Sequence, residues 1–350
     1  MDFAFSDEQE MLRAAARTWL ADHYPLDRVA QLADSDAGWD PESWKQLTDL
    51  GWLDPELGPL EHAVLAEETG YALFAGPWFS TVGLAAPAYP SPPSHPTTLA
   101  FADDGASTLR AAITSVACRA DDELDGWRLS GVKRLVPDAA LAAEAVVVAR
   151  AGDTIGLFQL DLTAYPEVVH PLATVDSTRR LAELRLDGTP AESIGDPTRT
   201  RQTLTAIRRR ALALLACEAV GVGQRALDLA VSYAGTRTQF DRPIGSYQGV
   251  SHRLADSYSA VELARSLAYR AAWSVAANDS AVDEAVVTAA VAASQAATAS
   301  CENAIQAMGG IGFTWSHPLH RLYKRAQWIA SFDGTPARHR AELAALLLDG

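Results

Sequence analysis

Apolar residues recur at helical spacing near the start of the chain. Ser6 followed by Gln9 forms a capping box, in which each side chain satisfies a backbone donor of the other residue. The apolar positions that follow fall on one face of a helix; they are Met11, Leu12, Ala15, Trp19 and Leu20. This pattern predicts a helix over about residues 6–23.

Two more helical segments precede a proline-rich break. Residues 41–51 and 61–74 have helical apolar spacing, and Gly51 suits a C-terminal stop. The sequence PAYPSPPSHP, residues 87–96, then interrupts the pattern and predicts a linker. We therefore expect an N-terminal α-helical domain over residues 1–96.

The pattern changes to short apolar runs between about residues 97 and 196. Runs such as AEAVVVARAG and TIGLFQLDL alternate with turn residues, which is typical of an antiparallel sheet. A middle antiparallel β domain is expected over residues 97–196. A sheet that serves only as a scaffold remains an alternative.

Long amphipathic runs fill the remainder of the chain. Three of them exceed twenty residues, and they span residues 207–235, 247–277 and 281–310. Together with a shorter helix near the C-terminus they predict a C-terminal four-helix bundle over residues 197–350. The expected fold class is therefore an α+β multidomain protein with helical, β-sheet and helical-bundle domains in that order.

The charge balance excludes several classes of partner. The chain has 29 Lys and Arg against 44 Asp and Glu, a formal net charge of -15, so we expect neither a nucleic-acid nor a membrane partner. No apolar stretch approaches the roughly 20 residues that cross a bilayer, and the start MDFAFSDEQE has no secretory pattern. We expect a cytoplasmic protein in which a local group of donors binds any anionic ligand.

The cysteines give no sign of a metal site. Cys118, Cys217 and Cys301 are far apart and match no metal-ligand spacing. We interpret them as reduced thiols that fill the core.

The turn between the first two long helices holds an unexpected group of side chains for so acidic a chain. Its sequence is GTRTQFDRPIGSYQ, residues 235–248, and it contains Arg237, Gln239, Phe240, Arg242 and Gln248. A guanidinium presents a planar fork of donors that suits a pyrophosphate, and Phe240 offers an apolar face to a nucleotide ring. The simpler alternative is that Arg237 caps a helix and neutralises nearby carboxylates.

A second motif follows the third long helix. The sequence QAMGGIGF contains Gln306, Gly309, Gly310, Gly312 and Phe313. Paired glycines after a helix allow a ligand to approach the backbone closely. The alternative is that these glycines only end the helix.

These two motifs and the domain order resemble the acyl-CoA dehydrogenase family of flavoproteins over nearly the whole chain. The family motif R-x-x-F-G is matched by Arg237 and Phe240, with Asp241 in place of the usual Gly. The resemblance implies FAD as cofactor and an acyl-CoA as substrate. It also implies that the two motifs reach across a subunit interface to bind the adenosine diphosphate half of a neighbour's FAD.

The resemblance also marks a candidate base. Family members usually have a glutamate in a Y-E-G-T motif, and this chain has SFDGT, with Asp333 in that position and Thr335 as a further FAD contact. Asp is shorter by about 1.5 Å, and a misplacement of that size costs about a hundredfold in rate. Asp333 is either a weakened base or a residue left after the role was lost.

The other position used for the base in the family offers no carboxylate. It falls near Ala211, and Glu218 lies about two turns further on. We interpret Glu218 as a residue of the bundle.

The β domain departs from the family pattern where the flavin ring would bind. Catalytic members have a K-x-W-I-T-N-like motif, and here the segment is VKRLVPD, in which Lys133 matches but Leu135 and Pro137 replace the aromatic and hydroxyl residues. A T-E-P-x-A-G-S-D-like motif survives only as a faint match in ADDGAS. Leu135 and Pro137 supply no donors to a flavin ring.

The half-site lent to a neighbour is thus retained, while the half-site used in cis is eroded. This pattern is similar to the shorter subunit of actinobacterial heterotetrameric acyl-CoA dehydrogenases that act on CoA-linked steroid side chains. The resemblance implies a companion subunit in an α2β2 assembly with two FAD, and an electron-transfer flavoprotein as acceptor.

Three alternatives stay open. The first is a self-sufficient homotetramer with Asp333 as base. The second is a flavin-dependent monooxygenase of the same fold, and the third is a helical scaffold that binds nothing. The acyl group, whether a steroid side chain or a fatty acyl chain, is not defined by these motifs.

Several residues near the C-terminus are assigned packing or surface roles. His317 and His320 have no third ligand and a proline between them, so a metal site is not expected. Trp315 and Trp328 have a spacing compatible with bundle packing. A predicted solvated basic face consists of Arg321, Lys324 and Arg325.

Overall fold

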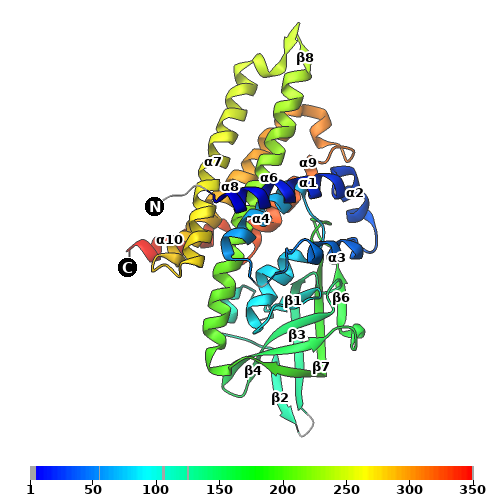
Figure 1. Ribbon diagram of the computed structural model, residues 1–350, viewed down its shortest axis with the longest axis vertical. Helices are drawn as coiled ribbons and strands as arrows, with labels where there is room; N and C mark the ends of the chain where they lie inside the picture. The colour runs from blue at the N-terminus through cyan, green and yellow to red at the C-terminus, as the bar shows by residue number, and fades with distance from the viewer. Residues whose placement is uncertain (1–4, 55, 105–106, 124–125, 349–350) are drawn as a thin grey trace. The chain divides into compact units, whose positions relative to one another are not determined.

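The chain forms two compact units that are interleaved in sequence. A computed structural model describes residues 5–54, 56–104, 107–123 and 126–348 (Figure 1). Unit 1 comprises Met1–Ala33, Gly58–Phe74 and Leu212–Gly350, and unit 2 comprises Asp34–Leu57 and Ala75–Ala211. The boundaries of the three predicted domains remain a prediction.

The first helices of unit 1 start where the sequence predicts. Helix α1 (Asp7–His23) is capped by Ser6, whose Oγ accepts from Gln9 N while Gln9 Oε1 accepts from Ser6 N. The capping box is therefore confirmed. Helices α2 (Leu26–Asp34) and α4 (Pro59–Ala72) follow in this part of the chain.

Five helices form the C-terminal part of the fold. They are α6 (Thr200–Thr236), α7 (Gln248–Ala276), α8 (Val282–Met308), α9 (Leu319–Ser331) and α10 (Pro336–Leu348). Alanines dominate the buried face of α8, which lets neighbouring helices approach closely. A Cβ atom added to Gly223 would lie 3.2 Å from Ala297 Cα, so α6 and α8 pack nearly backbone to backbone.

Helices α4 and α6 cross even more closely. A Cβ atom added to Gly70 would lie 2.1 Å from Glu218 O, and one added to Gly221 would lie 2.0 Å from Glu67 O. Only glycine fits at either position, because any side chain would overlap the backbone of the facing helix.

A sheet forms the centre of unit 2. Its strands are β1 (Thr97–Ala100), β2 (Arg119–Glu123), β3 (Gly126–Pro137), β4 (Glu144–Ala151), β5 (Thr154–Asp161), β6 (Val169–Leu172) and β7 (Leu181–Ile194). The strand order is β1-β4-β2-β3-β7-β5, with β6 on β7, and β4 also pairs with β5. Most pairs are antiparallel as predicted, but β1 and β2 each pair with β4 in parallel.

Short helices complete unit 2. They include α3 (Pro41–Asp49), α5 (Leu109–Ala112) and a π-helix at Phe79–Ala85. The proline-rich segment predicted as a linker lies within this unit, where Ser94 O accepts a hydrogen bond of 2.9 Å from Trp44 Nε1.

The described residues settle two simpler points. Cys118, Cys217 and Cys301 are free and buried, as predicted for core-filling thiols. Within the same part of the chain, no helix is long and apolar enough to cross a bilayer, and no group of three or more His, Cys, Asp or Glu is placed to hold a metal.

Candidate functional site

The motif between α6 and α7 forms a small β-hairpin. Strands β8 (Thr238–Gln239) and β9 (Arg242–Pro243) pair antiparallel, with Gln239 opposite Arg242. Phe240 and Asp241 form the two-residue turn, and both have positive φ, +52° and +65°. Two positive φ angles are the signature of a type I′ turn, which favours Asn-Gly and disfavours a bulky aromatic residue. The turn therefore holds Phe240 at a conformational cost.

Contacts within the segment hold the hairpin. The guanidinium carbon of Arg242 lies 4.0 Å from the centroid of the Tyr247 ring, and the Tyr247 hydroxyl donates to Gln239 O at 3.1 Å. Ile244 N also donates to Arg237 O at 2.8 Å. Tyr247 thus braces both strands, so the turn is pre-formed.

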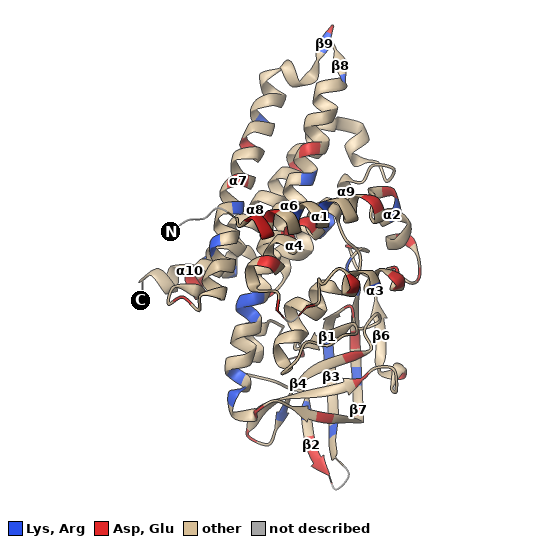
Figure 2. Ribbon diagram, in the orientation of Figure 1, with Lys and Arg blue, Asp and Glu red and all other residues tan. Residues whose placement is uncertain are grey.

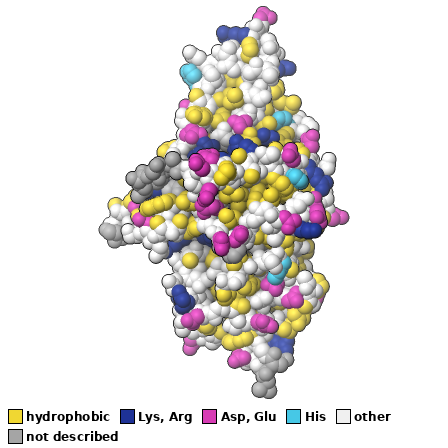
Figure 3. Space-filling model, in the orientation of Figure 1, with side chains coloured by type: hydrophobic (Ala, Val, Ile, Leu, Met, Phe, Trp, Pro, Cys, Tyr) yellow, Lys and Arg dark blue, Asp and Glu magenta, His cyan; other side chains and the backbone are white. Residues whose placement is uncertain are grey.

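The hairpin presents its motif residues to solvent. Phe240 is 87% exposed, and Arg237, Gln239 and Gln248 are exposed as well. Figure 1 shows β8 at the far end of the α6–α7 pair, and Figure 2 shows basic and acidic residues together at β8 and β9. The same end carries basic and acidic side chains on the face drawn in Figure 3. A strained, exposed aromatic side chain between cations suits a binding surface.

The glycine motif forms the C-terminal end of α8. Gly309 has φ +62° and ψ -135°, a conformation that is essentially restricted to glycine. A Cβ atom added to Gly310 would meet nothing within 4 Å, whereas one added to Gly312 would lie 2.8 Å from Ile305 O. Gly312 therefore serves packing, and Gly310 leaves open space beside the backbone.

The structure brings the two motifs to the same end of the α7–α8 pair. Arg253 donates to Asn303 Oδ1 at 3.3 Å near this end, and Arg270 lies 3.6 Å from Glu284 near the other, so the helices run antiparallel. Gln248 precedes Arg253 and Gln306 follows Asn303 by about one turn each, at 1.5 Å per residue. Gln248 and Gln306 therefore lie on the same side of the Arg253–Asn303 contact along the two antiparallel helices.

The SFDGT segment lies at the junction of α9 and α10. Asp333 is 7% exposed and has φ +53°, and Gly334 follows with φ +127°. Thr335 Oγ1 accepts from Arg338 N at 3.3 Å and so caps the first turn of α10. Thr335 also lines a cavity of about 470 Å³ among α8, α9 and α10, together with Glu302, Gln327 and Arg340.

The predicted solvated basic face is wrong for two of its three residues. Arg325 is 1% exposed; it pairs with buried Glu218 at 2.6 Å and donates to Phe74 O at 3.2 Å. Arg321 is buried too, and Lys324 alone remains partly exposed. The buried carboxylate makes burial of the Arg325 charge tolerable, and the interpretation of Glu218 as a bundle residue is confirmed.

Trp315 also differs from the prediction. It is 75% exposed instead of packed in the bundle, with Lys324 Nζ 4.2 Å from its ring centroid. Trp328 is half-buried against Phe332, as expected for a packing residue.

The β-domain motif retains its lysine in a structural role. Lys133 is completely buried, and its Nζ donates to Asp103 Oδ2 at 3.0 Å and to Phe101 O at 3.2 Å. Burial lowers the pKa of Lys133. For Asp103, burial opposes the change, but the Lys133 charge and hydrogen bonds lower the carboxyl pKa.

The neighbouring positions offer no side-chain donors. Leu135 is exposed with φ +52°, and Pro137 uses its carbonyl oxygen to accept from Thr98 Oγ1. The aliphatic and pyrrolidine side chains cannot hydrogen-bond a flavin ring. The two parts of the chain thus differ in what they expose: the hairpin and the glycine motif offer exposed polar, cationic and aromatic side chains and open space beside the backbone, and this edge offers no side-chain donors at Leu135 and Pro137.

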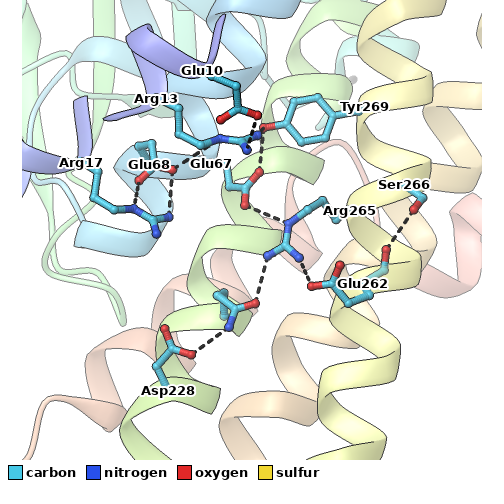
Figure 4. A network of polar contacts seen from close by, with 11 residues as sticks. Glu10, Arg13, Arg17, Glu67, Glu68, Asp228, Glu262, Arg265, Ser266 and Tyr269 are labelled. Atoms are coloured by element: carbon cyan, nitrogen blue, oxygen red, sulfur yellow. Dashed lines mark hydrogen bonds and ion pairs between the residues drawn. The ribbon is translucent and has the colours of Figure 1, made fainter. Parts of the chain in front are cut away.

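A polar network that the sequence analysis missed anchors α7 to α4. Glu67 accepts from Tyr269 Oη at 2.7 Å and from Arg265 Nε at 3.0 Å (Figure 4). The next residue, Glu68, accepts two hydrogen bonds from Arg17. Burial and the nearby Glu67 charge raise the pKa of Tyr269 well above its usual value, so the hydroxyl remains a donor. The adjacent glutamates within an apolar helix were the signal that could have indicated this network.

Tyr247 was missed as well. Nothing in the local pattern separates it from an ordinary turn tyrosine, although its position directly before Gln248 was a hint.

Comparisons with known proteins cover the whole chain. The family described as "Acyl-CoA dehydrogenase, C-terminal domain" matches residues 203–348. The acyl-CoA dehydrogenase IpdE2 of Mycobacterium tuberculosis is 32% identical over 94% of each chain. Among solved structures, the Tcur3481-Tcur3483 steroid ACAD G363A variant matches with a TM-score of 0.85 and 28% identity over 98% of each chain. The ChsE4-ChsE5 complex from Mycobacterium tuberculosis matches with a TM-score of 0.86 and 25% identity over 100% of each chain.

Proposed function

The chain belongs to the acyl-CoA dehydrogenase family, and on this premise we propose that it supplies the adenosine-diphosphate half-site for FAD to a catalytic partner in an α2β2 assembly. At the level of the family, the predictions of an oxidoreductase acting on CH–CH bonds and of FAD as cofactor are confirmed. The α,β-desaturation of an acyl-CoA is the reaction that such an assembly performs.

The observation that carries the proposal is the strained and exposed turn at Phe240. The side chain is 87% exposed although its backbone is in the left-handed region. Solvent gives no reason to hold a phenylalanine there, whereas an adenine ring of a second chain's FAD does. Arg237 and Gln239 on the same hairpin, with Gln248, Gln306, Gly309 and Gly310 nearby, would bind the ribose and diphosphate.

FAD, when bound, accepts the β hydride of the acyl group. This chain's own residues would grip the nucleotide tail and orient it toward the partner. Because Leu135 and Pro137 supply no donors, the ring and the acyl thioester would be held by the companion subunit. The solved ChsE4-ChsE5 complex and the steroid ACAD Tcur3481-Tcur3483 support a companion subunit and suggest a CoA-linked steroid side chain as the acyl group.

The test is flavin content with and without the companion. The chain is purified alone and after co-expression with the companion acyl-CoA dehydrogenase, and FAD is measured per chain by absorbance. We expect the lone chain to be colourless and the complex to contain two FAD per four chains. Full flavin occupancy of the lone chain would overturn the proposal.

A matched pair of variants connects that result to the hairpin. Arg237→Ala removes an exposed guanidinium of the hairpin, and we expect at least a tenfold loss of FAD affinity in the complex. Arg270→Ala removes a guanidinium at the other end of α7 and should leave the FAD affinity unchanged. Equal FAD affinity in both variants would contradict a role for the hairpin.

A self-sufficient homotetramer with Asp333 as base is the second candidate. The observation that favours it is the buried, left-handed conformation of Asp333, because such backbone strain often occurs at catalytic positions.

A further inference from the structure

A cavity of about 160 Å³ lies among α1, α2, α4 and α6 of unit 1. None of its residues belongs to the proposed half-site. The apolar part of its lining includes Leu20, Tyr24, Leu26 and Ala72. The polar side chains of its lining are those of Arg17, Glu68, Tyr71 and Arg225.

Tyr71 organises these polar side chains. Its hydroxyl donates to Asp228 Oδ2 at 2.8 Å and accepts from Arg225 Nη1 at 3.2 Å. The guanidinium carbons of Arg17 and Arg225 lie 4.7 and 4.9 Å from the centroid of its ring. Burial is the first cause that raises the pKa of Tyr71, so the phenol stays protonated and keeps Asp228 as its acceptor.

The guanidinium groups of Arg17 and Arg225 differ in whether a carboxylate contacts them. Arg17 donates to both carboxylate oxygens of Glu68, at 2.8 and 2.9 Å (Figure 4), so its charge is neutralised in the cavity wall. For Arg225, no carboxylate oxygen of the described residues lies within 4 Å of the guanidinium. Its Nε is buried without a hydrogen-bond partner among those residues. Arg225 is therefore a cation in the cavity wall without a direct carboxylate partner, and Asp228 reaches it only through the Tyr71 hydroxyl.

We propose that this cavity binds a short aliphatic monocarboxylate. The carboxylate bonds to the Arg225 guanidinium, the group for which a planar carboxylate is the natural partner. The alkyl chain then covers Leu20, Tyr24 and Leu26, which a purely polar ion leaves uncovered.

Size and charge narrow the ligand class. With about 30 Å³ for each water molecule in the liquid, the volume of about 160 Å³ corresponds to about five waters. An acid of about four carbons fits this space, and a CoA thioester or a steroid does not. Glu68 in the wall disfavours a second negative charge, so a monocarboxylate is preferred to phosphate.

Ligand-observed NMR and thermal unfolding with sodium butyrate test the proposal. Sodium phosphate and sodium chloride at equal ionic strength and pH 7 serve as the comparison salts. We expect butyrate to bind wild-type protein with a millimolar Kd and to raise the Tm, since a ligand of the folded state stabilises it. Arg225→Met should weaken butyrate binding at least tenfold, while Arg270→Met on α7 should leave it unchanged.

A second variant distinguishes butyrate binding in the cavity from binding at the protein surface. Ala72→Leu fills the cavity but keeps Arg225, so it should abolish butyrate binding; it also carries the test if Arg225→Met does not fold. Unchanged butyrate affinity in either folded variant overturns the proposal. So does phosphate binding that is tighter than butyrate binding, or a Tm rise with butyrate no larger than that with chloride.

Discussion

At the scale of single residues, positive φ angles occur both at glycines and at residues with side chains, and only the second group pays a steric cost. Gly309 and Gly334 reach such angles at little cost because glycine has no Cβ. Phe240, Asp241 and Asp333 reach them with side chains, at about 1–3 kcal/mol each. These three positions lie within the two segments that the resemblance marks as cofactor-binding or catalytic, and the other described non-glycine residues with positive φ, Leu73, Leu135, Asp138 and Asn278, lie outside them.

Asp333 offers a sharp test between the two candidate functions. Asn tolerates the left-handed backbone, so Asp333→Asn removes the carboxylate without adding backbone strain. If a residue of the companion removes the α proton, we expect kcat of the assembled enzyme to change less than about twofold. The measurement is dehydrogenation of an acyl-CoA with ferrocenium as acceptor.

A large loss in the same assay has the opposite meaning. Removal of a general base lowers the rate by about 10²–10⁴, and a loss of that size in Asp333→Asn would establish Asp333 as the base. Far-UV circular dichroism and flavin content of the variant serve as controls for its fold.

At the scale of elements, the crossing of α4 and α6 depends on two glycines. Gly70 faces the Glu218 backbone, and Gly221 faces the Glu67 backbone. Glu67 and Glu68 next to this crossing carry the hydrogen bonds to α7 and α1. The close approach of α4 to α6 therefore also sets the position of α7, whose first residue is Gln248.

Two glycine substitutions in α6 test this dependence. A Cβ at residue 221 would lie 2.0 Å from Glu67 O, so we expect Gly221→Ala to separate the helices and to lower the free energy of unfolding by roughly 3 kcal/mol. A Cβ at residue 235 meets nothing within 4 Å, so Gly235→Ala in the same helix should be neutral or stabilising by up to about 1 kcal/mol. Chemical denaturation measures both, and equal stability of the two variants would contradict the account.

At the scale of the whole molecule, each unit has its own buried charge pair. Unit 1 contains Glu218 and Arg325, and unit 2 contains Asp103 and Lys133. Breaking a buried pair leaves one charge without its partner, which costs about 3–5 kcal/mol. Because each pair is internal to one unit, its loss should affect that unit first.

Asp103→Asn should therefore destabilise unit 2 by about 3–5 kcal/mol at pH 7, with amide hydrogen exchange in β3 and β7 as the measurement. Burial lowers the pKa of Lys133. At pH values between this lowered pKa and the usual lysine pKa, the unfolded state therefore binds more protons than the folded state. Stability then rises with pH, most steeply in the variant, which lacks the counter-charge. The difference in the free energy of unfolding between wild type and Asp103→Asn should shrink as the pH approaches 10.

The wild-type pair has a second pH dependence, of the same sign, in acid. The pKa of Asp103 is lowered, with burial opposed by the Lys133 charge and hydrogen bonds, so its contribution to stability is present above the usual aspartate value and is lost as the pH falls below it. If the stability difference between wild type and Asp103→Asn stays constant from pH 6 to pH 10, Lys133 is not a buried cation whose charge destabilises the folded state.

The sequence by itself determined what depends on neighbours along the chain. The Ser6 capping box fixed the start of α1, and the helical periods and the glycine after Met308 fixed the long helices, because both signals act within a few residues. The family motifs also named the hairpin and glycine residues of the candidate site, whose roles in FAD binding remain a prediction.

Only the tertiary structure decided what depends on residues far apart in sequence. Arg325 is buried because Glu218, on another helix, faces it, while Trp315 is exposed because no element covers most of it. The parallel pairing of β1 with β4 and the arrangement of Arg17, Tyr71 and Arg225 around one cavity are likewise absent from local patterns. A helical period specifies which side chains share a face, but the charge or space opposite that face is set by the packing of distant segments.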